Sequence, residues 1–175
     1  MIPGVSRKLQ WQRVLCWIAV GGAWLAWSPV AGANEKAGLV PGARPPLVLV
    51  VSRKTALENL TFLEVRLVFL AQKQFVSGKR VIPLNHSPLT ETRVAFDRLV
   101  LGLTPDQAGK YWIDRKIKGQ GDPPKSIAVV SLLLKVVGML EGAISYVRAE
   151  QLTPDVKALR VDGKVHQDRD YPLRE

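Results

Sequence analysis

Residues 85–93 bring hydroxyl, amide, imidazole and guanidinium groups together where a predicted strand leads into a predicted helix. In open α/β sheets, ligands bind outside the carboxyl ends of the strands. The first turn of a helix adds unpaired backbone N–H groups and a partial positive charge, and both attract anions. The segment is therefore a candidate oxyanion site, and its candidate ligand-binding residues are Asn85, His86, Ser87, Thr90, Thr92 and Arg93.

The same segment also has a purely structural interpretation. Ser87 or Thr90 can cap the helix through its hydroxyl, as these residue types commonly do. Arg93 would then be solvated, and His86 would be a polar loop residue. Glu91 also opposes an anion, because it places a negative charge in the first turn. Oxyanion binding and ordinary capping are both open at this point.

Other kinds of site chemistry find little support in the sequence. A nucleophilic enzyme needs a Ser or Cys beside a base, but His86 and His166 are the only histidines, and His166 lies in a polar stretch where solvation is expected. No cluster has the ligand spacing of a zinc site, and no glycine-rich nucleotide motif follows a strand. We therefore expect a non-enzymatic protein with no catalytic residues, no metal site and no cofactor.

Three elements are expected ahead of the candidate site. Leu47–Ser52 is a continuous apolar run of strand length, which is typical of a strand covered on both faces. Thr61 and Glu64 have the spacing of a capping box and precede an amphipathic stretch, which predicts a helix. A second strand is expected over residues 80–84, after a turn at residues 77–79.

Helices are expected around and after the site. Ser87 followed by Pro88 predicts a helix start, and Gly102 predicts the end of that helix. Thr104 begins another helix by an N-cap hydroxyl with proline next to it. The remaining expectations are irregular chain over residues 118–124, a buried helix over 127–137 capped by Ser126, and strands over 142–147 and 156–161. This order predicts an α/β fold, a mixed sheet flanked by helices.

Residues 1–33 have the features of a cleaved secretory signal peptide. Arg7, Lys8 and Arg13 supply its positive part, an uncharged stretch follows, and cleavage is expected after Ala33. The expected divisions are a signal peptide (1–33), a flexible lead-in (34–46), one domain (47–163) and a polar C-terminal tail expected to fray (164–175). The expected location is the periplasm, with no transmembrane segment after cleavage.

Charge limits the partners of the mature chain. Loss of the three cationic leader residues lowers the net charge from +10 to +7, which favours anionic partners in general. The basic residues are scattered and few aromatic residues lie beside them, so a nucleic acid partner is not expected. Cys16 is the one cysteine of the sequence and lies in the leader. The mature chain therefore contains no cysteine, and disulfides are excluded.

The order of these features resembles a known family. A Gly-Ala-Ile-Ser-Tyr-Val strand over residues 142–147, a loop and helix carrying Phe96, and the intervening Gly119-Gln120-Gly121 are the segments that carry the likeness. They resemble the phosphate-binding proteins of ABC transporters, and most closely the short, single-lobe members of that periplasmic-binding-protein-like family. The resemblance implies a single lobe of the type II periplasmic-binding-protein-like fold.

The resemblance also implies site residues. Counting back from Phe96 places Thr92 and Thr90 at the family's two hydroxyl positions. Glu91 occupies the family's glycine position, and His86 falls where the family has an upstream arginine.

Two functions follow as expectations. The first is a periplasmic, non-enzymatic solute-binding module for phosphate or a related oxyanion, which binds weakly or needs a periplasmic or membrane protein partner to complete the site. The alternative is an envelope interaction or sensory module that has kept the fold and lost the ligand. An uncharacterised hydrolase is a third, less favoured reading.

Overall fold

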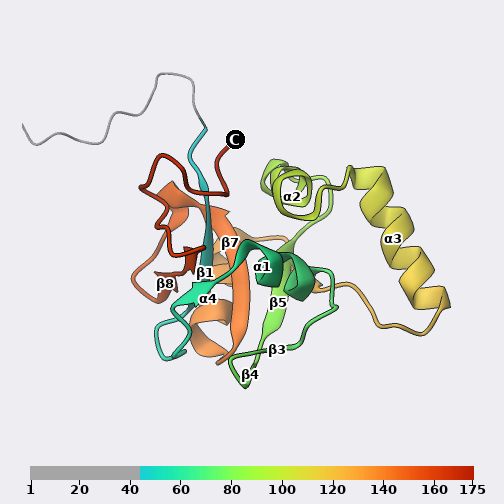
Figure 1. Ribbon diagram of the computed structural model, residues 1–175, viewed down its shortest axis with the longest axis horizontal. Helices are drawn as coiled ribbons and strands as arrows, with labels where there is room; N and C mark the ends of the chain where they lie inside the picture. The colour runs from blue at the N-terminus through green and yellow to red at the C-terminus, as the bar shows by residue number, and fades with distance from the viewer. Residues whose placement is uncertain (1–43) are drawn as a thin grey trace, which may run out of the picture. The chain divides into compact units, whose positions relative to one another are not determined.

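The computed structural model describes residues 44–175. The predicted signal peptide and nearly all of the predicted lead-in lie outside the described residues. A five-stranded mixed sheet with the strand order β6-β5-β7-β1-β8 forms the centre of the fold (Figure 1). Strand β5 runs parallel to β6 and β7, whereas β1 runs antiparallel to β7 and β8. The carboxyl ends of β5, β6 and β7 therefore lie at the same end of the sheet.

The elements follow one another in a mixed α/β order. Up to the candidate site they are β1 (Leu47–Ser52), β2 (Asn59–Leu60), α1 (Phe62–Phe69), β3 (Phe75–Val76), β4 (Lys79–Arg80) and β5 (Ile82–His86). From the site onward they are α2 (Glu91–Phe96), a π-helix (Asp97–Leu101), α3 (Pro105–Ile117), β6 (Lys125–Ile127), α4 (Val130–Met139), β7 (Ala143–Arg148), a 3-10 turn (Ala149–Gln151), β8 (Val156–Ala158) and β9 (Arg160–Val161).

Apolar cores lie on both faces of the sheet. On one face, Leu49 and Ile144 pack with residues of α1, α2 and the π-helix, among them Phe69 and Phe96. On the other face, Val50 and Val147 pack against α4 (Figure 1). These two cores explain why β1 is apolar along its whole length, because a strand covered on both faces needs apolar side chains on both faces. The prediction for β1 is confirmed.

Two of the helix starts that the sequence predicts from capping, those at Thr61 and Thr104, are also confirmed. The Thr61 hydroxyl accepts a hydrogen bond from the Glu64 amide, and the Glu64 carboxylate accepts one from the Thr61 amide. Thr104 and Gln107 form the same reciprocal pair at the start of α3. Gly102 ends the π-helix with φ of 66°, as expected of a C-terminal glycine.

Three expectations about element boundaries are wrong. The second strand covers Ile82–His86 rather than residues 80–84, because Lys79 and Arg80 pair with β3 in a separate hairpin. Ser126 belongs to strand β6 and caps no helix, so the helix expected over 127–137 is α4, Val130–Met139. The strand expected over 156–161 is divided into β8 and β9, and β9 pairs with β2 outside the main sheet.

Helix α4 is also less buried than the sequence predicts. Leu133, Leu134 and Val137 face the sheet and are buried. Leu132 and Met139 face outward, with 50% and 77% of their surface exposed. The helix is therefore apolar nearly all round without being covered all round.

The expectation that residues 164–175 fray is wrong. Tyr171 and Leu173 are buried in the main core, and the Leu47 amide donates a hydrogen bond to the Leu173 carbonyl at 3.0 Å. The Arg174 guanidinium donates to the carbonyls of His166 and Asp168. Two apolar side chains in a polar stretch are enough to dock it, because β1 offers a buried face for them.

We predict that Gly142→Ala is far more destabilising than Gly163→Ala. Both glycines have positive φ, 81° and 77°, which costs any L residue roughly 1–2 kcal/mol. A Cβ on Gly142 would lie only 2.5 Å from the Arg80 carbonyl oxygen, whereas one on Gly163 meets nothing within 4 Å. Urea unfolding should therefore show about 2 kcal/mol more loss for Gly142→Ala. Equal losses would contradict the close approach.

Candidate functional site

The segment that follows β5 is a turn rather than the start of a helix. The Thr90 amide and the Thr90 hydroxyl both donate to the Ser87 carbonyl, at 3.3 and 2.9 Å. Leu89 within this turn has φ of 66° and is 77% exposed. Helix α2 begins only at Glu91. The prediction that Ser87 and Pro88 begin the helix is therefore wrong by about one turn.

Neither hydroxyl caps α2. Thr90 occupies the N-cap position, but its hydroxyl makes no capping bond because it donates back to Ser87. Val94 is the first residue of the helix whose amide reaches a backbone acceptor, the Thr90 carbonyl. Within residues 44–175, the amides of Glu91, Thr92 and Arg93 have no protein acceptor. The capping interpretation leaves these N–H groups unexplained.

Arg93 is buried and ion-paired, contrary to the interpretation that it is solvated. Its Nε donates to Oδ2 of Asp97 at 2.7 Å, and the two residues are only 8% and 4% exposed. Burial raises the pKa of Asp97, although the charge of Arg93 opposes that shift. Only Nε is used in this pair, so the two Nη groups of the guanidinium have no acceptor among the described residues.

Asn85 and His86 lie beneath this surface, where they join β5 to β7. Both are buried, and Oδ1 of Asn85 accepts a hydrogen bond from the Tyr146 hydroxyl at 3.2 Å. Nε2 of His86 lies 2.7 Å from the Tyr146 carbonyl. Because a carbonyl only accepts, Nε2 carries the proton in the neutral ring. These two side chains hold the strand that leads to the site, and their bonded atoms face the protein.

His86 should make the stability of the fold depend on pH. Burial lowers its pKa, so the folded protein keeps the ring neutral while the unfolded chain takes up a proton below about pH 6.5. The free energy of unfolding is therefore expected to fall as pH is lowered from about 8 to about 5.5. His86→Gln should reduce this fall, measured as the difference between urea unfolding at the two pH values.

His166 is the control for that experiment, because burial lowers its pKa as well. His166→Gln should remove only the contribution of His166 to the pH dependence, and the double variant should lose the contributions of both histidines. A pH dependence that is unchanged in His86→Gln would contradict the assignment.

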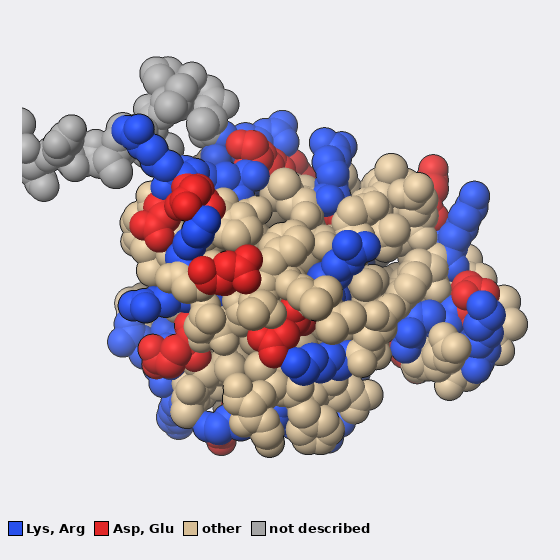
Figure 2. Space-filling view, viewed as in Figure 1, with Lys and Arg blue, Asp and Glu red and all other residues tan. Residues whose placement is uncertain are grey.

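The negative charge of Glu91 at the helix start is partly offset. Its carboxylate lies 3.0 Å from a guanidinium nitrogen of Arg44, and both side chains are mostly exposed. Arg44 also lies 3.6 Å from Glu175, which pairs with the buried Arg148 at 3.2 Å. Charges of both signs thus alternate at this edge of the molecule, as they do over the face in Figure 2.

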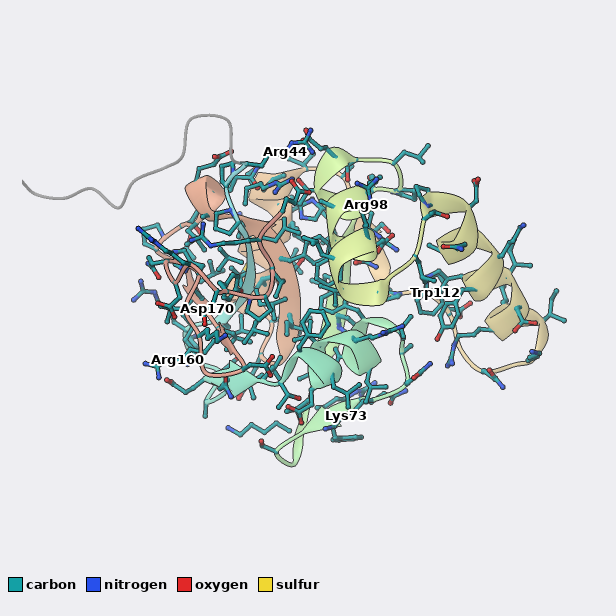
Figure 3. All side chains as sticks on the ribbon, turned by 45° about the horizontal axis from the view of Figure 1, so that its top comes forward. Arg44, Lys73, Arg98, Trp112, Arg160 and Asp170 are labelled. Atoms are coloured by element: carbon teal, nitrogen blue, oxygen red, sulfur yellow. The ribbon has the colours of Figure 1, made fainter. Side chains whose placement is uncertain are left out.

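A cavity of about 210 Å³ opens beside Arg93, between α2 and α3. Figure 3 shows Trp112 on the side of α3 that faces α2. Sequence reasoning missed Trp112 and Asp97 as site residues. The signal for Trp112 was present, because Pro105, Ala108 and Trp112 have the spacing of one helix face, and the capping box at Thr104 fixes where that helix begins.

No group of His, Cys, Asp and Glu that could hold a metal ion occurs within residues 44–175. No helix in the same range is both long and apolar enough to cross a membrane. The hydrogen-bond donors at the site are backbone amides, hydroxyls and one guanidinium, and the carboxylates of Glu91 and Asp97 lie beside them. Such donors suit an oxyanion.

Solved structures show the same fold, although no family model and no curated protein sequence matches this chain. An ABC-type phosphate transport receptor from Vibrio cholerae superposes with a TM-score of 0.60 at 16% identity, over 75% of this chain and 55% of the receptor. A phosphate ABC transporter substrate-binding protein with bound phosphate from Clostridium perfringens gives 0.54 at 16%, over 69% and 46%. PstS from Borrelia burgdorferi gives 0.54 at 13%, over 70% and 49%.

The chain therefore has a periplasmic-binding-protein-like α/β fold, as predicted. Its structural neighbours are phosphate-binding receptors, and it spans about half the length of these proteins. At such low identities the likeness defines the fold, and the site must be judged from its own residues.

Proposed function

We propose that this chain is a non-enzymatic solute-binding module that holds phosphate or a related oxyanion at the start of α2. The observation that carries the proposal is the set of open donors there: the amides of Glu91, Thr92 and Arg93 and the two free Nη groups of Arg93. The half-exposed hydroxyls of Ser87, Thr90 and Thr92 would complete the set. A structural neighbour with bound phosphate supports the choice of anion.

Binding at this site should be weak. Most of these donors, the hydroxyls and the Glu91 and Thr92 amides, belong to exposed or half-exposed residues, so water competes for them and the effective dielectric is high. Glu91 adds a negative charge nearby, which Arg44 offsets only in part. We expect a dissociation constant on the order of millimolar for the isolated chain, and tighter binding where a protein partner covers the site.

Calorimetric titration of the chain with phosphate and with sulfate tests the proposal. The site variant is Arg93→Gln combined with Asp97→Asn, which removes the guanidinium without leaving a buried charge and leaves the net charge unchanged. Arg98→Gln is the control, since Arg98 is an exposed cation on the turn after Arg93. The site variant should lose the binding heat, and the control should keep it.

The opposite pattern would show general attraction to a basic protein and would overturn the assignment of the site. No heat in any variant at millimolar anion would sink oxyanion binding altogether. The alternative, an interaction module in the envelope, would then be favoured by three exposed apolar side chains, Val129 at the N-cap of α4 and Leu132 and Met139 within it.

The proposal includes a periplasmic location, supported by the predicted leader and by the kind of proteins that share the fold. Mass spectrometry of the protein from a periplasmic extract should find Asn34 as the first residue. Recovery of the uncleaved chain in the membrane fraction would contradict this part of the proposal.

A further inference from the structure

The cavity between α2 and α3 begins where the proposed oxyanion site ends. Arg93 borders both, and Pro88 and Leu89 of the preceding turn form part of the cavity wall. Across from them, α3 contributes Ala108 and Trp112. A ligand held at the start of α2 would therefore have this cavity directly beside it.

The cavity is larger and more apolar than an inorganic anion requires. Its volume of about 210 Å³ is the liquid volume of roughly seven water molecules. Most of its wall is carbon: proline rings, Val94, Ala108 and the indole of Trp112. A small hydrated ion gains little from such a wall, whereas an apolar group gains by leaving water. Among the described residues of the wall, Arg93 is the one cation, and its ion-pair partner Asp97 is the one anion.

Two residues of the cavity wall carry polar atoms without a partner. Among residues 44–175, Nε1 of Trp112 has no acceptor and Oδ1 of Asp97 has no donor, and both atoms are buried. Trp112 and Asp97 are only 8% and 4% exposed. Buried polar atoms are nearly always bonded, and an exception calls for an explanation such as an absent ligand.

We infer that this cavity binds the apolar part of an organic phosphate or phosphonate whose anionic group lies at Arg93. The inference rests on the proposed function, and it names the class of ligand: an oxyanion with an apolar substituent rather than free inorganic phosphate. The substituent lies between Val94 and Trp112.

The test compares the binding of inorganic phosphate, phenylphosphonate and neutral benzyl alcohol to the chain from Asn34 to Glu175. Phenylphosphonate should bind at least about tenfold more tightly than inorganic phosphate, because its ring leaves water and enters the cavity. Benzyl alcohol should bind weakly or not at all. In ¹H–¹⁵N spectra, phenylphosphonate should shift the indole N–H signal of Trp112, the one tryptophan that remains after the predicted cleavage.

Gly109 offers a matched pair of variants. It lies in α3 on the cavity wall, and a Cβ added there meets nothing within 4 Å. Gly109→Leu should fill part of the cavity and remove the preference for phenylphosphonate while leaving phosphate binding intact. Gly109→Ala raises the helix propensity in a similar way but takes up little of the cavity volume, so this variant should keep the preference for phenylphosphonate over phosphate. Thermal melting checks that both variants are folded.

The outcomes separate this inference from the proposed function. Equal binding of phosphate and phenylphosphonate, unchanged in Gly109→Leu, would overturn the inference and leave oxyanion binding in place. Absence of binding by both anions would overturn both. Binding of phenylphosphonate without phosphate binding, lost in Gly109→Leu, would support the cavity as the main source of affinity. Equal binding of benzyl alcohol and phenylphosphonate would overturn the role of Arg93.

Discussion

Asp97→Ala is expected to lower the free energy of unfolding by about 3–5 kcal/mol, because it leaves the buried guanidinium of Arg93 without its partner. The Nε to Oδ2 distance is 2.7 Å, and neither residue is more than 8% exposed. Chemical denaturation with a spectroscopic readout measures the effect directly.

The matched control for this prediction is the Asp114–Lys118 pair. It has the same spacing of four residues and a similar distance, 2.8 Å, but both side chains are more than half exposed. Asp114→Ala should therefore cost no more than about 0.5 kcal/mol. If Asp97→Ala and Asp114→Ala lowered the free energy of unfolding by similar amounts, burial of the Arg93–Asp97 pair would have no effect on the cost of breaking it.

A second control distinguishes the net contribution of the Arg93–Asp97 pair to stability from the cost of leaving one buried charge unpaired. Replacing both members by apolar residues, Arg93→Met with Asp97→Leu, removes two buried charges together. This double variant should be much more stable than Asp97→Ala alone, and a nearly neutral effect is expected. Such a result would mean that Arg93 and Asp97 are not required for stability, which favours a role for the guanidinium at the surface of the site.

Phe96→Ala is also expected to cost about 3–5 kcal/mol. Phe96 is fully buried and stacks on Tyr146 with ring centroids 3.7 Å apart and an angle of 3°. Phe69 packs edge-on against Phe96 at 4.7 Å. Phe96→Ala should also disturb the positions of Asn85 and His86 in β5, because both residues are hydrogen-bonded to Tyr146.

Phe75→Ala removes the same atoms from an exposed position and serves as the control. Phe75 lies in the β3–β4 hairpin and is 57% exposed, so a change within about 0.5 kcal/mol is expected. Thermal or urea unfolding of the two variants gives the comparison. A Phe96→Ala loss as small as that of Phe75→Ala would contradict the aromatic core described here.

The sequence predicted the elements whose signals lie within a few residues of one another. Thr61 with Glu64 and Thr104 with Gln107 form the expected capping boxes, since a cap joins a side chain to an amide three residues away. The run Leu47–Ser52 predicted a strand covered on both faces, and each of its residues is buried. The fold class followed from the order of such elements, and the structure confirms it.

The sequence did not predict where neighbouring segments meet. The helix start was placed at Ser87 because Ser-Pro is a common local signal, but Thr90 turns its hydroxyl back to Ser87 and α2 begins at Glu91. Tyr171 and Leu173 looked like part of a frayed tail, and only the open face beside β1 makes them core residues. At these positions, contacts with residues distant in the sequence outweighed the local conformational preference.

By itself, the sequence determined the α/β class, the two capped helices, the buried strand and the chemical types gathered in residues 85–93. These depend on contacts between near neighbours in the chain, which composition and spacing record. Only the tertiary structure decided that Arg93 is buried against Asp97, that His86 is bonded to Tyr146, and that Trp112 lines a cavity beside Arg93. Burial is a property of packing between separate elements, and it determines which polar groups are satisfied within the protein and which remain open to a ligand.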